Sequence, residues 1–243
     1  MSEKILFVIP AYNEEKNISK PIKDIRENFK DADIIVVNDC SKDNTVSVLR
    51  ELGVEYLDLP VNLGYSGAVQ TGIKYAKRNN YDYVIQFDGD GQHLAMEAHK
   101  LFDVMKASSA NIVIGSRFIE KTEYKHPFFR KIGTKFFSIL IKLITRVKIT
   151  DPTSGFQVLD KKTIATYSQP GQYPEFPDAN LIAKMIINGY RVEEVSCKMK
   201  ERIDGVSMHA GMMKPLKYAV RNTYSLVIIG LTSVLRGKRN NDV

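Results

Sequence analysis

The sequence predicts an α/β protein with a mostly parallel sheet flanked by helices. The first observation is a set of short apolar runs rich in β-branched residues, at 5–9, 34–38, 54–59, 83–87 and 112–115. The second is that the segments between the first four runs, 14–29, 44–53 and 66–79, have the pattern of helices. Strands that alternate with helices are joined by right-handed crossovers, which places helices on both faces of the sheet. This regular alternation ends near residue 121.

The composition is that of one large globular domain, alone or with an appendage. The 243 residues are 44% hydrophobic and 26% charged, and they contain no internal repeat or low-complexity segment. Cys40 and Cys197 lack metal-ligand spacing and are too few for a disulfide framework, which favours a reducing cytoplasm. The first predicted strand begins within a few residues of Met1, so we expect no signal peptide. The net charge is +7.

Two acidic residues directly follow the fourth strand. Asp88 and Asp90 flank Gly89 at the end of the apolar run 83–87. Open α/β sheets bind ligands beyond the carboxyl ends of their strands. Mg²⁺ and Mn²⁺ prefer oxygen ligands and are commonly held by one or two carboxylates together with a bound diphosphate. The pair is a candidate metal site, although Asp and Gly are also ordinary turn residues.

Two other loops should reach the same edge of the sheet. The sequence PAYNE (10–14) follows the first strand, and DCSKD (39–43) follows the second. An aromatic face, separate acidic positions and a metal pair would serve the base, ribose and phosphates of a nucleoside diphosphate. Ser41 and Asp43 could equally well be helix N-caps instead of contacts to a nucleotide. The glycines of GYSG (64–67) do not form a G-x-G-x-x-G motif after the first strand, which argues against a nicotinamide dinucleotide.

Seven short motifs occur in the order in which one known family has them. They are VIPAYNE (8–14), VNDCS (37–41), NLGYSGA (62–68), DGDGQH (88–93), GSR (115–117), DPTSGF (151–156) and ERIDGVS (201–207). In these motifs the sequence resembles the family-2 glycosyltransferases of the GT-A fold. Within them it is similar to the dolichol-phosphate mannose synthase-like branch, which transfers a sugar to a polyprenyl phosphate. The resemblance covers residues 5–207; one departure is Ala95, where relatives usually have proline at the entry to a helix.

This resemblance implies roles for individual residues. The implied contacts to the nucleotide sugar are Pro10, Ala11, Tyr12, Glu14, Asp39, Gly67 and Asp88. The implied ligands of a Mg²⁺ or Mn²⁺ cofactor are Asp88, Asp90 and Gln92. The implied contacts to an acceptor phosphate are Arg117, Arg130, Thr134 and Arg202. A guanidinium presents a planar fork that matches phosphate oxygens, although any one surface arginine is usually solvated. We expect Asp90, Arg117 and Asp151 to be the catalytic residues.

A strongly basic segment follows the last of the apolar runs. Residues 125–150 contain no Asp or Glu, and their basic residues are Lys125, Arg130, Lys131, Lys135, Lys142, Arg146 and Lys148. A helix at about 128–147 would gather four of these charges within about 60° of its circumference, opposite its aliphatic residues. Such a helix lies naturally on an anionic membrane surface, and the missing acids favour this over simple packing on the core. We find no nucleic-acid motif.

The C-terminal segment supports a membrane location. Residues 222–235 carry no charge and are followed by basic residues. Their apolar part, 226–235, is much shorter than the ~20 residues of a spanning helix, so we expect it to lie on the bilayer or against a partner. We therefore divide the chain into a GT-A domain (1–210) and an interfacial helix with a basic tail (211–243). Within the domain, 1–120 would bind nucleotide sugar and metal, and 121–210 would bind the acceptor.

We expect a peripheral protein at the cytoplasmic face of the membrane, and its candidate protein partners are a small membrane subunit or a second copy of the chain. The predicted reaction is metal-dependent, inverting transfer of a hexose from a nucleotide sugar, a UDP-sugar before a GDP-sugar, to undecaprenyl or dolichyl phosphate. Such a phosphate is already an anion and needs positioning rather than a strong base.

Two other hypotheses stay open. A glycan hydroxyl in surface-polysaccharide assembly would need a base. Asp151 and Asp178 are the candidates, although Asp178 is also a good N-cap for a helix that begins at Ala179. The third hypothesis is a non-catalytic membrane-associated partner protein, against which intact Asp88, Asp90 and Gln92 argue.

Overall fold

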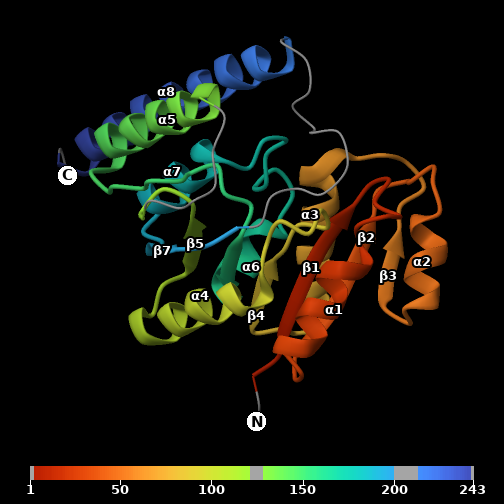
Figure 1. Ribbon diagram of the computed structural model, residues 1–243. Coiled ribbons are helices and arrows are strands. Elements are labelled where there is room, and N and C mark those ends of the chain that lie inside the picture. The colour runs from red at the N-terminus through yellow and green to blue at the C-terminus, as the bar shows by residue number, and fades with distance from the viewer. Residues whose placement is uncertain (1–2, 121–127, 200–212, 242–243) are drawn as a thin grey trace.

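The computed structural model describes residues 3–120, 128–199 and 213–241, with side chains omitted for 128–130, 213–218 and 234–241. It contains a seven-stranded sheet in the order β3-β2-β1-β4-β6-β5-β7 (Figure 1). The strands are β1 (Ile5–Ala11), β2 (Asp33–Asn38), β3 (Glu55–Asp58), β4 (Tyr83–Gln86), β5 (Ile112–Ser116), β6 (Gln157–Asp160) and β7 (Val192–Ser196). Only β6 runs antiparallel to its neighbours, β4 and β5. The predicted mostly parallel sheet is confirmed.

Helices cover both faces of this sheet, as predicted. They are α1 (Ser19–Asn28), α2 (Thr45–Glu51), α3 (Gly64–Arg78), α4 (Ala95–Ser108), α5 (Phe128–Thr145), α6 (Lys161–Tyr167), α7 (Ala179–Ile187) and α8 (Met213–Asn241). Apolar residues of α1, α2 and α4 pack on one face, around Phe7, Ile85 and Val113. Those of α3, α6 and α7 pack on the other face, and α5 and α8 add to the same core. Alternate residues of each strand therefore face two separate cores.

The first helix begins later than predicted. The sequence pattern placed its start at residue 14, but α1 starts at Ser19. The segment between them is a turn, in which the amides of Asn17 and Ile18 donate to the carbonyl of Glu14. The Glu14 amide itself donates to Thr45 Oγ1 at 2.9 Å. Because this partner is distant in sequence, the local pattern could not reveal it, and Glu14 belongs to a loop at the sheet edge.

The two long helices α5 and α8 lie side by side at one end of the molecule, above α7 (Figure 1). The predicted basic amphipathic helix corresponds to α5, whose Phe137 and Ile141 are buried. On α8, Asn222 and Leu226 are buried, so the C-terminal segment packs on its own chain. No helix in the described parts of the chain has the length and apolar content needed to span a membrane.

A second face of the same helix pair is apolar and exposed. On α5 its residues are Ile132, Phe136, Ile139 and Leu143. On α8 they are Val220, Tyr224, Val227, Ile228 and Leu231. In α5 the residues recur at intervals of three or four, and in α8 they do so except for the adjacent Val227 and Ile228, so each set shares one side of its helix. We call these residues the apolar face.

The proposed division of the domain at residue 120 runs through a single sheet. Strand β6 belongs to the second half but pairs with β4 and β5 of the first half. Val84 lies opposite Leu159, and Ile112 lies opposite the same leucine on the other side. The segments before and after residue 120 therefore share the sheet and the cores on both of its faces.

Candidate active site

The loops after β1 and β2 are joined at the carboxyl edge of the sheet. The Asn13 amide donates to Ser41 Oγ at 2.9 Å, and the Lys42 amide donates to Asn13 Oδ1 at 2.7 Å. Asp43 accepts from the amides of Glu15 and Thr45. Ser41 therefore ties two loops together, whereas Asp43 both ties them and accepts from an amide in the first turn of α2. The N-cap position of α2 is Asn44, whose side chain makes no capping hydrogen bond.

The residues expected to contact the nucleotide surround this edge. Tyr12 is 47% exposed, whereas the preceding residue, Ala11, is buried. Asp39 is buried, and its Oδ1 accepts from the Leu63 amide at 2.7 Å, which connects β2 to the start of α3. Gly67 lies in the first turn of α3, where a Cβ atom would come within 2.4 Å of Leu63 Cβ. Glycine at this position allows the loop to pack directly on the helix.

Asp88 is held by two side chains from different parts of the chain. Its Oδ1 accepts from the Tyr65 hydroxyl at 3.0 Å, and His93 Nε2 lies 2.9 Å from its Oδ2. His93 is buried and stacks on Phe156, with ring centroids 4.7 Å apart. Burial alone would raise the pKa of Asp88, but the charge and hydrogen bond of His93 and the Tyr65 hydroxyl lower it. Asp88 is therefore an ionised carboxylate with a fixed orientation.

Asp90 and Gln92 complete the predicted metal set on the loop after β4. The Gln92 amide donates to Asp90 Oδ1 at 3.0 Å, and the intervening Gly91 has a φ of +76°, which glycine adopts without strain. The described residues contain no group of three or more His, Cys, Asp or Glu side chains that could enclose a metal. Two carboxylates suit Mg²⁺ or Mn²⁺, which take their remaining ligands from water and a diphosphate. The donor set therefore fits the predicted cofactor.

The loop that carries DPTSGF (151–156) lies close to Asp88. A Cβ atom on Gly155 would lie 2.5 Å from the Tyr65 hydroxyl and 3.5 Å from Asp88 Oδ1. Only glycine fits there without displacing Tyr65. Gly155 therefore allows this loop to approach Asp88 and its partner Tyr65.

Arg117 and Asp151 form a buried ion pair at the other end of this loop. Arg117 Nε donates to Asp151 Oδ2 at 2.6 Å, and Nη2 donates to Oδ1 at 2.8 Å. Asp151 has a side-chain exposure of 0% and also accepts from Thr153 Oγ1. Thr153 Oγ1 lies 3.5 Å from Thr134 Oγ1. The structure thus brings Arg117, Thr134 and Asp151 together, and the geometry favours Asp151 as the residue that orients Arg117 rather than as a base.

Two predicted phosphate contacts are not placed by side chain. Arg130 lies in the first turn of α5, where only the backbone is described, and Arg202 lies outside the described residues. The ERIDGVS motif lies outside them as well.

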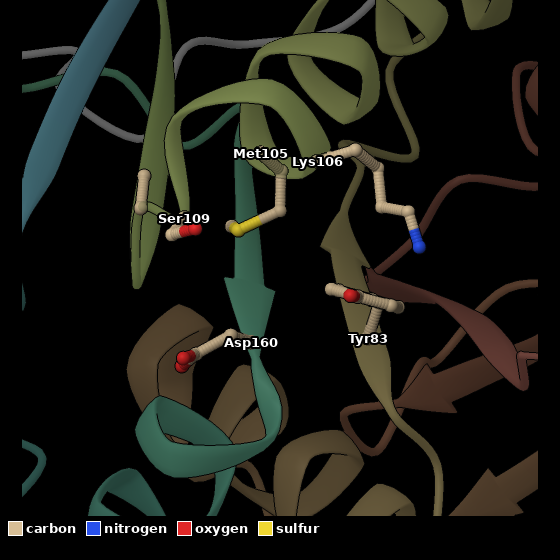
Figure 2. A pocket seen from close by; sticks show the side chains of 6 residues that line it. Tyr83, Met105, Lys106, Ser109 and Asp160 are labelled. Carbon is tan, nitrogen blue, oxygen red and sulfur yellow. The ribbon is translucent and has the colours of Figure 1, made fainter.

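A different cavity lies at the other end of the parallel strands, near the amino end of β4. Its lining residues are Tyr83, Met105, Lys106, Ser109, Ala110 and Asp160 (Figure 2). Its two charged groups already have partners, because Lys106 pairs with Glu3 and Asp160 accepts from Thr163 and Asn111. The cavity lies at the amino end of β4, away from Asp88 and Asp90.

The sequence is similar to a known protein family and to several of its members. The model of glycosyl transferase family 2 matches residues 6–167. The chain belongs to glycosyl transferase family 2. It is 30% identical to the UDP-N-acetylglucosamine–dolichyl-phosphate N-acetylglucosaminyltransferase of Methanococcus voltae, over 82% of this chain and 86% of that one. It is 26% identical to the polyprenol monophosphomannose synthase of Mycolicibacterium smegmatis, over 90% of this chain and 88% of that one.

The fold of this family 2 glycosyltransferase also resembles solved structures. The crystal structure of glucosyl-3-phosphoglycerate synthase from Mycobacterium tuberculosis, in complex with Mn²⁺, uridine diphosphate and phosphoglyceric acid, matches with a TM-score of 0.71. The match covers 94% of this chain and 79% of that one at 14% identity, and therefore shows the GT-A fold alone.

The sequence did not predict the hydrogen-bond partners of Asp88. Tyr65 and His93 stand inside the motifs, but nothing in the sequence shows that both reach the same carboxylate. The sequence also left open whether Asp178 caps α7 or acts as a base. It precedes α7 without making a capping hydrogen bond, and its charge helps to raise the pKa values of Tyr65 and Tyr173, for both of which burial is the main cause.

Tyr65→Phe should weaken metal-dependent binding of a nucleoside diphosphate. The change removes one hydrogen bond to Asp88 and leaves the ring in place. Losing a hydrogen bond that orients a metal ligand typically lowers metal affinity by about 10-fold. Calorimetric titration of UDP at several Mn²⁺ concentrations measures the effect. Tyr75→Phe is the matched control, because Tyr75 lies on the same helix and donates to Glu55 at 2.6 Å. Equal Mn²⁺ dependence in the wild type and Tyr65→Phe would contradict the role given to Tyr65.

Proposed function

We propose that this glycosyltransferase moves a hexose from a nucleotide sugar to a polyprenyl phosphate, with inversion at the anomeric carbon. The observation that carries the proposal is that Arg117 donates to Thr153, which also lies beside Thr134. Thr153 is on the same loop as Gly155, which lies against Tyr65 and close to Asp88. A cationic acceptor site thus adjoins a carboxylate pair suited to a diphosphate. The names of the relatives from Methanococcus and Mycolicibacterium support the same acceptor class.

On the donor side, Asp88 and Asp90 would hold the metal, with Gln92 beside them. Bound Mg²⁺ or Mn²⁺ would neutralise the diphosphate leaving group as a Lewis acid. Tyr65 and His93 keep Asp88 ionised and oriented for this task. Tyr12 and Asp39 would meet the base and ribose, with a UDP-sugar favoured over a GDP-sugar, and Pro10, Ala11, Glu14 and Gly67 would shape the same pocket.

On the acceptor side, the residues of this chain would mainly position a charged nucleophile. A phosphate monoester is already ionised at neutral pH, so no side chain has to remove a proton from it. The buried carboxylate of Asp151 fixes the plane of the Arg117 guanidinium, which matches phosphate oxygens. Arg130, Thr134 and Arg202 would complete the contacts. In-line attack by this phosphate on the anomeric carbon gives inversion.

The apolar face would rest on the membrane that contains the acceptor. Its residues lie on the exposed sides of α5 and α8, which contact each other, and the basic residues Lys131, Lys135, Lys142 and Arg146 flank it on α5. Apolar side chains that enter the interface and lysines beside anionic headgroups both favour binding. This orientation would place the enzyme at the cytoplasmic face of the membrane, as a peripheral protein.

A glycan hydroxyl is the second candidate acceptor. The half-buried carboxylate of Asp178 favours it, because its charge acts on Tyr65, the hydrogen-bond donor to Asp88. Such a carboxylate could accept the proton of a hydroxyl nucleophile.

The deciding experiment is an assay of purified protein with Mn²⁺ or Mg²⁺, labelled UDP- and GDP-hexoses, and undecaprenyl phosphate in detergent. Label that moves into organic solvent supports the proposal, and the anomeric configuration of the product tests inversion. Binding of the donor without labelled lipid would favour the glycan acceptor.

Removal of divalent metal should abolish this transfer reversibly. Two carboxylates alone would repel the diphosphate of the donor, and the cation reverses that interaction. Activity measured after chelation with EDTA should fall to background, and added Mn²⁺ or Mg²⁺ should restore it. Zn²⁺ should restore less, because the site lacks nitrogen and sulfur ligands. Full activity in excess EDTA would refute the metal assignment.

A further inference from the structure

A basic groove runs along α5 beside the Arg117–Asp151 pair. Its volume is about 450 Å³. One wall is a single side of α5, and the other is formed by Phe118 and by the segment that leads to Asp151. The lining residues are Phe118, Lys131, Thr134, Lys135, Ser138, Ile139, Lys142, Lys148 and Thr150. The groove thus combines the apolar side chains of Phe118 and Ile139 with four lysines.

The charge of this groove is uncompensated within the described structure. No ion pair among the described residues involves Lys131, Lys135, Lys142 or Lys148. The acids behind the groove are engaged elsewhere, since Asp151 pairs with Arg117 and Glu194 accepts from the amides of Thr150 and Asp151. The groove therefore attracts anions.

The groove borders the apolar face of the helix pair. Ile139 belongs to both, and Lys131, Lys135 and Lys142 lie on the adjoining side of α5. When the apolar face enters a bilayer, these lysines lie at the depth of the lipid headgroups. A ligand that is apolar at one end and anionic at the other fits this place.

We propose that the four lysines of the basic groove bind the headgroup of an anionic phospholipid of the bilayer, whereas the buried Thr134, which also lines the groove, stays with the acceptor phosphate. The inference rests on the membrane orientation given above, but it adds a lipid that is not a substrate. Lys131 and Lys142 are separated by roughly 16 Å along the helix, a longer span than a single acceptor phosphate needs. Lysines are flexible point charges that suit such loose contacts, whereas the rigid fork of Arg117 suits one oriented phosphate. The groove would hold the enzyme with Arg117 directed at the membrane surface.

The first test measures binding to vesicles without any sugar donor. Vesicles of phosphatidylcholine alone are compared with vesicles that also contain phosphatidylglycerol, and bound protein is measured by co-sedimentation. The double variant Lys135→Gln/Lys142→Gln should bind the anionic vesicles about 30-fold more weakly than wild type, as expected for two charges at such a surface. Lys74→Gln/Lys77→Gln, which changes the same charge on exposed positions of α3, is the control. Equal losses in both double variants would overturn the proposal.

The second test separates a groove from diffuse attraction. Monomeric dihexanoyl phosphatidylglycerol should bind wild type saturably, with one lipid per chain, and Lys135→Gln/Lys142→Gln should weaken this binding at least about 10-fold. Arg146→Gln should have little effect, because Arg146 is exposed nearby but does not line the groove. Absence of saturable binding, or an equal loss with Arg146→Gln, would overturn the proposal.

A further arm identifies the source of the lipid phosphate. Farnesyl phosphate should bind without displacing dihexanoyl phosphatidylglycerol from the wild type. Displacement would assign the groove to the acceptor and overturn the proposal. None of these readouts needs turnover, so failure of the transfer assay leaves them interpretable. Unchanged UDP binding by Lys135→Gln/Lys142→Gln would show that the variant is folded.

Discussion

Asp90→Ala is expected to lower sugar transfer by about 10³-fold or more while the protein stays folded. Asp90 supplies one of only two carboxylates on the loop after β4, and a divalent metal stabilises the leaving diphosphate by several kcal/mol. Its side chain is half-buried and accepts from the Gln92 amide, so its loss should cost only about 1 kcal/mol of folding free energy. Steady-state kinetics and thermal unfolding measure the two effects separately.

Asp103→Ala is the matched control for this prediction. Asp103 lies on the exposed side of α4, so the same chemical change there should leave both activity and stability near wild type. Asp90→Ala should also lose the Mn²⁺-dependent part of UDP binding. An Asp90→Ala protein that keeps a tenth of the wild-type rate would remove Asp90 from the metal site.

Arg117→Ala is expected to destabilise the protein by about 3–5 kcal/mol and to abolish transfer. The change leaves the fully buried Asp151 carboxylate without its cation, and removing one partner of a buried pair has a cost of this size. Urea denaturation measures the free energy of unfolding. The double variant Arg117→Ala/Asp151→Ala should be more stable than Arg117→Ala, because no buried charge is then left unpaired.

An exposed ion pair provides the control for Arg117. Arg191 and Glu193 are joined at 2.9 Å with side chains that are 59% and 37% exposed, so Arg191→Ala should cost at most about 1 kcal/mol. Arg117→Lys keeps the charge but loses the two-pronged contact with Asp151. It should fold better than Arg117→Ala yet remain impaired in use of the acceptor. A cost below about 1 kcal/mol for Arg117→Ala would show that Asp151 does not depend on it.

Much of the fold could be predicted because buried parallel strands are continuous apolar runs. Strands β1, β2 and β4 each have such a run, and the helices between them are amphipathic. Strand β6 has only four residues, and it enters the sheet by pairing with strands that precede it by many residues. The start of α1 was misplaced for a similar reason, since the Glu14 amide bonds to Thr45 rather than within a helix. Nonlocal hydrogen bonds decided both cases.

The candidate site divides in the same way. Asp88, Asp90 and Arg117 could be proposed as site residues from motifs, because the chemistry expected of them depends on residue type and on position at the ends of strands. The contacts of Asp88 with Tyr65 and His93, and of Asp151 with Arg117, depend on how distant loops meet. The sequence therefore proposes which groups act, and the structure adds which groups hold them in place.

The insertion of β6 between β4 and β5 also constrains the order in which the chain can fold during synthesis. Strand β5 leaves the ribosome before its two neighbours in the sheet, β6 and β7. The parallel strands β1 to β4 can assemble early, whereas β5 has no edge to join until residues 157–160 are available. Unpaired apolar strands are prone to aggregate, so this interval is the vulnerable period for the nascent chain. The loop that carries Asp88 and Asp90 would therefore form before Gly155 and Arg117 can be brought beside it.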